Sequence, residues 1–510
     1  MSQILKLMSG TGKPEAACEE LSKGLGVAVY LASVAKGENG IYAVAKNAKS
    51  ERRAVRVTKL APPNSEKTFD VGEGYKAYLT PADFSSAVDF QKALPGLKPV
   101  PLGLSRSAGL GDRLGLATPG HVKAIRGTGI RPIFAQQSIR EMSRTGRTPK
   151  DVMADAVFGV QQEGYVSGFG SDADHLKATV DIDNCLAAGF TMFTVDPGEH
   201  VDNSADGLDV AALNERAGKI PWDKLESSLQ ETISRYAKSV NLPGDVKLDA
   251  TPENVLRAVV KYGKAVAHTL SMFRHLANKS EPGTFELEVS VDETEAPTTV
   301  FEHFYFASEL KRLGVDWVSL APRYIGRFEK GVDYIGDLKA LAKELKCHAA
   351  VMRGVGPYKM SIHSGSDKFS VYPIIAEIAG EFVHLKTAGT SYLAALSALA
   401  RVEPEFIRRI YEFARSRYET DKATYHVSAD LKKTPEPKSV KDKELAALID
   451  EFNARQVFHV TFGSVLTAKD PGGKFLFRDD LYALLRKHEN VHLQVLAEHI
   501  KKHLKSFKRA

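Results

Sequence analysis

The sequence has few cysteines and no long apolar run. Its 510 residues include three cysteines, Cys18, Cys185 and Cys347, which lie far apart and form no CxxC motif. This spacing argues against a disulfide framework and favours a reducing compartment. No apolar stretch approaches the ~20 residues that a membrane-spanning helix requires, and the N-terminal MSQILKLMSG lacks a signal-peptide pattern. We therefore expect a cytoplasmic protein with no membrane partner.

The sequence also lacks a strong charge imbalance. Its formal net charge is +6, with lysine and arginine interspersed among aspartate and glutamate, so the charge distribution does not indicate a nucleic-acid partner. The last predicted helix ends in basic residues and carries His492 and His499, which are expected at its surface. The length exceeds that of one ordinary core, which predicts one large domain with additions. The composition is compatible with a homo-oligomer and does not specify one.

The hydrophobic pattern divides the chain into three parts. Residues 1–95 contain short alternating runs around Gly37-Glu-Asn-Gly40, which is a hairpin signal, and are predicted to form an accessory segment with some β structure. Residues 96–403 alternate between strand-like and helix-like stretches, and residues 404–510 are predicted to form a helical extension. Within the middle part, residues 200–280 are too long for a plain crossover and predict a helical insertion near the active-site mouth.

Eight strand-like stretches in the middle part predict the fold. Thr118-Pro119, Thr148-Pro149 and Thr251-Pro252 each place an N-cap residue before an N1 proline, so helices are expected to begin there. Eight strands separated by helices describe an α/β protein with a (β/α)8 TIM barrel, and a doubly wound open sheet is the alternative. The predicted strands are Arg113 to Ala117, Arg131 to Ala135, Val166 to Gly170, Thr191 to Val195, Phe285 to Val291, Asp316 to Leu320, Tyr358 to Ile362 and Glu381 to Leu385.

Reactive residue types gather where the predicted strands end, which is where barrels of this class place their active sites. Asp174 and His175 follow the third strand, although a capped helix start would explain them too. On the fifth strand one face carries four polar residues, Glu286, Glu288, Ser290 and Asp292, because side chains alternate along a strand. Buried carboxylates there would be costly unless they bind a metal, catalyse or form ion pairs inside the barrel. His363 follows the seventh strand.

Small and cationic residues follow the last two strands. Ser364 and Ser366 lie in a turn of the kind whose backbone N–H groups bind anions. Lys368 and Lys386 are of the type that holds a carboxylate, with solvated loop positions as the alternative. The other residues expected to bind substrate are Arg113, Gln136 and Asp367.

Two histidines and a carboxylate on separate strands predict an open site for a divalent metal ion. His175 and His363 supply imidazole nitrogens that suit Zn²⁺, Mn²⁺ or Ni²⁺. The third ligand is open between Glu288 and Glu329, which lies in the loop from Arg323 to Lys330 after the sixth strand.

These residues carry a resemblance to a known family. From about Gly109 to Ala429, the chain resembles the tagaturonate/fructuronate epimerase family of hexuronate metabolism. The stretches that carry the resemblance are 111–121, 172–177, 288–293, 333–337 and 362–368. The resemblance implies a metal-dependent isomerase that interconverts D-tagaturonate and D-fructuronate, with a sugar acid as its small-molecule substrate.

A more distant similarity is to class II aldolases. Their Asp-His pair looks like Asp174-His175, and their His-Gly-Gly-Ser-Gly turn looks like the stretch that begins at His363. This likeness implies retro-aldol chemistry with Asp174 as the base and both histidines on the metal, and Glu288 is then expected to return the proton. The aldolases' further metal histidine has no counterpart in Pro322–Gly326, which argues against ordinary bisphosphate aldolase activity. A sugar-acid aldolase and a non-catalytic sugar-binding barrel are the alternatives.

Overall fold

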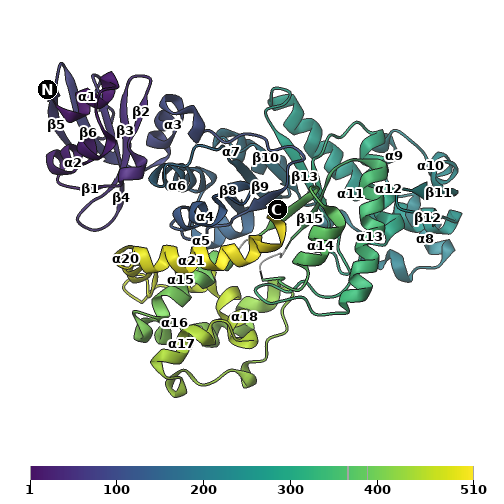
Figure 1. The fold of residues 1–510 in the computed structure, drawn as a ribbon. Coiled ribbons are helices and arrows are strands. Elements are labelled where there is room, and N and C mark those ends of the chain that lie inside the picture. The colour runs from purple at the N-terminus through teal and green to yellow at the C-terminus, as the bar shows by residue number, and fades with distance from the viewer. Residues whose placement is uncertain (1, 364–366, 388, 509–510) are drawn as a thin grey trace.

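A closed barrel of parallel strands forms the centre of the computed structural model, which describes residues 2–363, 367–387 and 389–508 (Figure 1). The strands follow one another around the ring in chain order, which confirms the predicted (β/α)8 barrel and excludes the doubly wound sheet. The barrel strands are β7 (Ser107–Gly109), β8 (Arg131–Ser138), β9 (Gly170–Leu176), β10 (Met192–Val195), β13 (Glu286–Ser290), β14 (Ser319–Ala321), β15 (Lys359–Ile362) and β16 (Val383–Lys386).

The first predicted strand is wrong, and the third is displaced. Arg113 to Ala117 forms a loop after β7, because the Asp112 carboxylate accepts backbone N–H groups of Leu114, Gly115 and Ala117 and so folds the segment into a turn. The strand predicted to end at Gly170 in fact begins there. Asp174 and His175 therefore lie on β9 itself and not in the loop after it.

Helices connect the strands and cover the outside of the barrel. Thr148 and Thr251 are N-caps that accept the backbone N–H groups of Asp151 and Asn254, as their sequences predicted. The helices that accompany the barrel strands are α4 (Thr118–Ile125), α5 (Ile139–Thr145), α6 (Pro149–Gln162), α7 (Thr179–Ala187), α11 (Pro252–Lys279), α12 (Val300–Arg312), α13 (Leu338–Val355), α14 (Tyr372–Ala379) and α15 (Thr390–Ala400). Among the described residues, no helix combines the length and apolar character that crossing a bilayer requires.

The N-terminal segment is a separate antiparallel sheet at one end of the molecule (Figure 1). Gly37 pairs with Gly40 across the predicted two-residue hairpin turn. A Cβ at Gly40 would lie 1.9 Å from the carbonyl oxygen of Val57, so the close approach of the two strands requires glycine there. The elements are α1 (Gln3–Ser9), α2 (Pro14–Leu25), β1 (Ala28–Val29), β2 (Ala35–Gly37), β3 (Gly40–Lys46), β4 (Arg52–Thr58), β5 (Lys67–Gly72), β6 (Tyr75–Pro81) and α3 (Phe84–Ala93).

The insertion after β10 lies along the outer helices of the barrel. Arg235 forms an ion pair with Glu309 of α12, and Ile220 lies against Gly263 of α11. The insertion contains a β-hairpin as well as helices, and α11, which lay within the predicted insertion, is the crossover helix of the barrel. Its elements are α8 (Val210–Ala217), α9 (Trp222–Leu225), α10 (Leu229–Tyr236), β11 (Ser239–Leu242) and β12 (Val246–Asp249).

The C-terminal helices pack against the barrel and reach its mouth. The final helix α21 (Glu489–Leu504) contacts α4 and α15. Arg455 of α18 donates to the Asp367 carboxylate at 2.7 Å and to the carbonyl of Gly331 at 2.6 Å, so one buried guanidinium joins two barrel loops to the extension. The other helices are α16 (Pro404–Asp421), α17 (Leu445–Leu448), α18 (Phe452–Val460), α19 (Phe462–Thr467) and α20 (Arg478–Lys487).

We expect Arg455→Met to lower the free energy of unfolding by about 3 to 5 kcal/mol, because it leaves the buried Asp367 carboxylate without its guanidinium. Denaturant unfolding measures the difference. Arg274→Met is the control, because Arg274 pairs with Glu226 at 2.6 Å while both side chains are half exposed. That pair should contribute about 1 kcal/mol or less. Equal losses of unfolding free energy in the two variants would contradict the role of Arg455 in holding the two barrel loops.

Candidate active site

Strand β9 delivers three polar side chains to the barrel interior and mouth. Asp172 and Asp174 share a face because side chains alternate along a strand. The pairing of β9 with β10 shifts register after Phe193, and His175 adopts a left-handed backbone with φ of 54°. This irregularity lets His175 face the mouth directly beside Asp174, with its Nδ1 atom 2.7 Å from the Asp174 carboxylate.

Strand β13 supplies a line of acidic and polar groups. Glu286 lies at the base of the barrel, where its carboxylate accepts the N–H groups of Leu102 and Gly103 at 3.0 and 2.7 Å. Glu288 lies in the middle of the barrel and is fully buried. Asp292 comes just after the strand and reaches the mouth, where Ser290 donates to its carboxylate at 2.5 Å.

The ammonium group of Lys386 lies among three buried carboxylates. Its Nζ atom is 2.8 Å from Asp172, 2.6 Å from Asp174 and 2.7 Å from Glu288, and it donates to Thr194 at 2.7 Å. Burial disfavours the charged lysine, but the three carboxylates outweigh burial and hold the pKa of Lys386 well above its ordinary value. The lysine predicted to hold a substrate carboxylate is thus engaged by the protein's own carboxylates.

The three carboxylates differ in the direction of their pKa shifts. Burial raises the pKa of Asp172 to about 6. Burial also tends to raise the pKa values of Asp174 and Glu288. Nearby cations outweigh this effect and hold both pKa values well below the ordinary range. At Asp174 these cations are His175 and Lys386, and at Glu288 they are Lys386 and His363. Asp174 and Glu288 therefore stay ionised at neutral pH.

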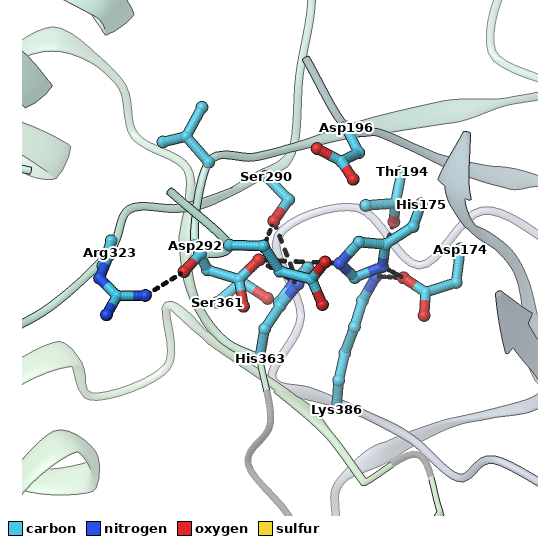
Figure 2. Close-up of polar contacts among 12 residues, drawn as sticks. Asp174, His175, Thr194, Asp196, Ser290, Asp292, Arg323, Ser361, His363 and Lys386 are labelled. Atoms are coloured by element: carbon cyan, nitrogen blue, oxygen red, sulfur yellow. Dashed lines mark hydrogen bonds and ion pairs between the residues drawn. The ribbon is translucent and has the colours of Figure 1, made fainter. Parts of the chain in front are cut away.

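Two histidines and Asp292 converge at the mouth (Figure 2). One ligand atom from each of His175, Asp292 and His363 lies within 4.8 Å of the others. His175 Nε2 is 3.7 Å and His363 Nδ1 is 3.3 Å from the same Asp292 oxygen. His175 Nε2 is buried and has no hydrogen-bond partner among the described residues. An unpartnered imidazole nitrogen that faces a carboxylate and a second imidazole fits a divalent cation.

A carboxylate orients each histidine from behind. Asp174 contacts His175 Nδ1 at 2.7 Å, and Glu288 contacts His363 Nε2 at 2.6 Å. The opposite ring nitrogens are left facing Asp292. Metal-bound histidines in proteins usually have such a partner, because it fixes the ring and makes the ligand nitrogen more basic. The two imidazoles, Asp292 and the supporting carboxylates thus suit a metal centre. Glu329, which was one candidate for the third ligand, does not belong to this group.

The metal-ligand group opens into a cavity of about 290 Å³. Its walls come from the loops after β13 and β14, and its cover comes from residues 425–428 of the C-terminal extension. Among the described residues that line this cavity, none comes from the insertion at 200–280. The lining residues are Asp292, Glu293, Pro322, Arg323, Tyr324, Arg327, Phe328, Glu329, Lys330, His363, Tyr425, His426, Val427 and Ser428.

Several predicted site residues hold loops in place around the mouth. Glu329 accepts hydrogen bonds from Ser428 and Gln456 at 2.7 and 2.9 Å, so its carboxylate fastens the cover and not the histidine cluster. Lys368 is buried and donates to the carbonyl of Glu329 at 2.8 Å. Burial lowers the pKa of Lys368 to about 7. Gln136 lies inside the site and donates to Asp174 at 2.9 Å.

Two other predicted substrate contacts face the C-terminal helices. Arg113 forms a buried ion pair with Glu141 at 2.7 Å and stacks over the ring of Phe462 at 3.7 Å. Asp367 lies 3.0 Å from His499 of α21, which is half-buried. The prediction that His492 lies at the surface was wrong, because this residue is buried. Ser364 and Ser366 lie outside the described residues.

Sequence reasoning missed four contributors to the site. Strand alternation put Asp292 on the Glu288 face and could have nominated it as a ligand. Asp196 follows β10 directly and lies near His175, and Arg323 was treated only as part of a loop. The cover at residues 425–428 is far from the barrel strands in the sequence, and no local signal pointed to it.

Comparison with known proteins gives the relationship of this chain. The model of the family described as tagaturonate epimerase matches residues 30–507. The chain belongs to the tagaturonate epimerase family. Within this epimerase family, a relative from Thermotoga maritima called tagaturonate/fructuronate epimerase is 44% identical over 435 residues, which are 85% of this chain and 87% of the relative.

Solved structures agree with this epimerase assignment. The native crystal structure of fructuronate-tagaturonate epimerase from Cohnella laeviribosi is 35% identical with a TM-score of 0.88, covering 97% of this chain and 99% of that one. A glycerol complex of the same enzyme gives the same identity and TM-score over 96% and 98% of the two chains. The similarity thus extends over the accessory sheet, the barrel and the C-terminal extension.

We expect Lys386→Met to destabilise the protein by about 3 to 5 kcal/mol at pH 7, because three buried carboxylates lose their cation. The low pKa values of Asp174 and Glu288 contribute stability that is present above their unfolded pKa of ~4 and lost below it. Without the ammonium these carboxylates take up protons more readily, so the deficit should shrink as the pH falls from 7 toward ~4. Denaturant unfolding across this range measures the change.

Lys359→Met is the matched control for Lys386→Met. Lys359 is a buried lysine of the same barrel, and its ammonium donates to the Ser107 hydroxyl at 3.0 Å. Burial lowers the pKa of Lys359, so its loss removes less charge compensation. A deficit that is equally pH-dependent in both variants would show that Lys386 is not the specific counterion.

Proposed function

We propose that this chain interconverts D-tagaturonate and D-fructuronate, with a divalent cation held by His175, Asp292 and His363. The convergence of these three side chains at the barrel mouth carries the proposal, because a carboxylate orients each histidine from behind. Membership of the epimerase family and the names of its relatives support the substrate pair.

The bound cation would act as a Lewis acid toward the substrate's ketone and neighbouring hydroxyl. Two imidazoles and one carboxylate suit Zn²⁺, Mn²⁺ or Ni²⁺. Asp292 replaces Glu288 and Glu329 as the third ligand in this proposal, since Glu288 supports His363 and Glu329 fastens the cover.

Retro-aldol cleavage followed by re-addition is the chemistry that we propose for this conversion, with direct deprotonation and transient oxidation as its rivals. The two sugar acids differ at a carbon two bonds from the ketone, whose C–H is not acidic, so enolisation cannot invert it. A base takes the proton of the hydroxyl on that carbon, and the bond toward the ketone side breaks to give an aldehyde and an enediolate. The aldehyde turns over, the bond reforms on its other face, and the proton returns to the new alkoxide.

Asp196 is the proposed proton-transfer group. Its carboxylate accepts a hydrogen bond from the backbone N–H of Gly198 at 2.9 Å, and it lies within 4.8 Å of an imidazole nitrogen of His175 and a carboxylate oxygen of Glu293. Asp174 accepts from Lys386, His175 and Gln136 at 2.6 to 2.9 Å. A carboxylate with three donors is a weak base, so these contacts favour a positioning role for Asp174.

The cover at residues 425–428 would keep the two fragments together. Ser428 is fastened to Glu329, and Tyr425 lies over the guanidinium of Arg144 at 4.8 Å. Exclusion of water protects the enediolate from protonation, and confinement prevents escape of the aldehyde. An aldolase would instead release both fragments, so retention separates the two activities.

Removal of the metal should abolish the conversion. We expect protein loaded with Zn²⁺, Mn²⁺ or Ni²⁺ to convert tagaturonate to fructuronate, and chelator-treated protein to be inactive until the ion is restored. Chromatography follows both sugars and any smaller carbonyl fragments. Conversion by metal-free protein would refute the role of the cation, and net accumulation of fragments would make the enzyme an aldolase.

Two carboxamide variants separate proton transfer from metal positioning. We expect Asp196→Asn to lower kcat roughly 100- to 10,000-fold with bound metal retained, because it removes a general base. Asp174→Asn should weaken metal affinity roughly 10- to 100-fold, because it removes the partner of His175. Metal content and kcat are measured on the same samples. Loss of metal from Asp196→Asn with normal kcat on reloading would contradict the assignment.

A further inference from the structure

Arg323 stands out because no carboxylate in the described part of the chain forms an ion pair with its guanidinium. It follows β14, lines the cavity, and donates from one guanidinium nitrogen to the backbone carbonyl of Asp292 at 3.4 Å (Figure 2). Its Nε atom is buried and has no hydrogen-bond partner among the described residues, and none of the carboxylates there lies within ion-pair distance. A partly buried guanidinium in this condition has lost hydration without replacing it.

The neighbouring cations of the cavity are already paired. Arg327 is 3.4 Å from Glu329, and Lys330 is 3.6 Å from Glu293. Each of these charges therefore has an acidic partner in the protein itself. Arg323 differs from both, although it lines the same wall, and its free N–H groups are the donors that a carboxylate of a ligand would use.

Asp292 places Arg323 relative to the reacting end of the cavity. The side chain of Asp292 faces His175 and His363, while its backbone carbonyl holds Arg323. The guanidinium thus lies on the far side of Asp292 from the two imidazoles. In a hexuronate the carboxylate lies at the opposite end of the carbon chain from the ketone. The ketone end of such a molecule would therefore lie at the histidines, and its carboxylate end would lie at Arg323.

We propose that Arg323 binds the carboxylate of the substrate and selects a uronate over the neutral ketose of the same configuration. This inference rests on the proposed function, because it assumes that the ketone lies at the histidine cluster. The planar guanidinium offers paired N–H donors that match a carboxylate in geometry and charge. A neutral sugar presents a hydroxymethyl group at that position, which makes weaker hydrogen bonds and leaves the guanidinium charge unbalanced.

The test compares Arg323→Met with wild type on two ligands, tagaturonate and tagatose. We expect the Kd or KM for tagaturonate to rise roughly 10- to 100-fold in the variant, because a hydrogen-bonded charge pair is lost. The Kd for tagatose, measured by calorimetry on the metal-loaded protein, should change less than about threefold. The wild-type preference for the uronate therefore collapses in the variant.

Arg327→Met is the matched control. It removes the same charge from the same wall of the cavity, but from an arginine that is already paired with Glu329. We expect it to change the tagaturonate Kd much less than Arg323→Met does. Equal effects of the two variants, or an equal loss of both ligands in Arg323→Met, would overturn the assignment. Arg323→Lys should restore part of the uronate affinity, and metal content and thermal unfolding exclude a misfolded variant.

Failure of this inference is distinguishable from failure of the proposed function. If wild-type protein converts tagaturonate and Arg323→Met does so with unchanged KM, the epimerase stands and the carboxylate lies elsewhere. If wild type converts neither sugar, calorimetry with tagaturonate still tests the arginine, because binding of the carboxylate does not need turnover. Unchanged tagaturonate affinity in the variant overturns the proposal in either case.

Discussion

The ion cluster around Lys386 is the interaction on which the site depends. A TIM barrel usually fills its interior with branched apolar side chains, whereas this one buries Asp172, Asp174 and Glu288 around a single ammonium. Buried charge is tolerated only where it is paired and hydrogen-bonded. The ammonium keeps Asp174 and Glu288 ionised, and the same two carboxylates orient the histidines of the mouth. Charge compensation at the centre of the barrel therefore sets the geometry at its surface.

The C-terminal extension completes what the barrel begins. Arg455 fastens Asp367 and Gly331, and Gln456 with Ser428 fastens Glu329, so the loops after β14 and β15 are both held by side chains of the C-terminal extension. The same extension lays residues 425–428 over the cavity. A hydrogen-bonded cover thus lies over the mouth, while the insertion after β10 forms an ion pair with the outer helix α12.

The sequence allowed prediction of the barrel because its signals are local. Proline-marked helix starts such as Thr148 and Thr251 and short apolar runs repeat along the chain. The failures were also local in origin. Asp112 accepts three backbone N–H groups and so forms a turn where the sequence pattern predicted a strand. Near the end of β9, His175 adopts a left-handed backbone that the pattern did not predict. The histidines that converge at the mouth could be named in advance, but the partners of Lys386, Asp367 and Glu329 could not, because they depend on which distant elements meet in space.

Asp292 connects the two ends of the proposed substrate site. The loop after the sixth barrel strand contains Arg323 and no histidine. A guanidinium is always protonated and has no lone pair for a metal, whereas Asp292 is the carboxylate that groups with the two histidines. Its carbonyl in turn holds the guanidinium. In the proposed complex the charges then alternate along one line, from the cation through Asp292 and Arg323 to the substrate carboxylate. An anionic ligand after β13 and a guanidinium after β14 would together adapt one barrel mouth to a sugar acid.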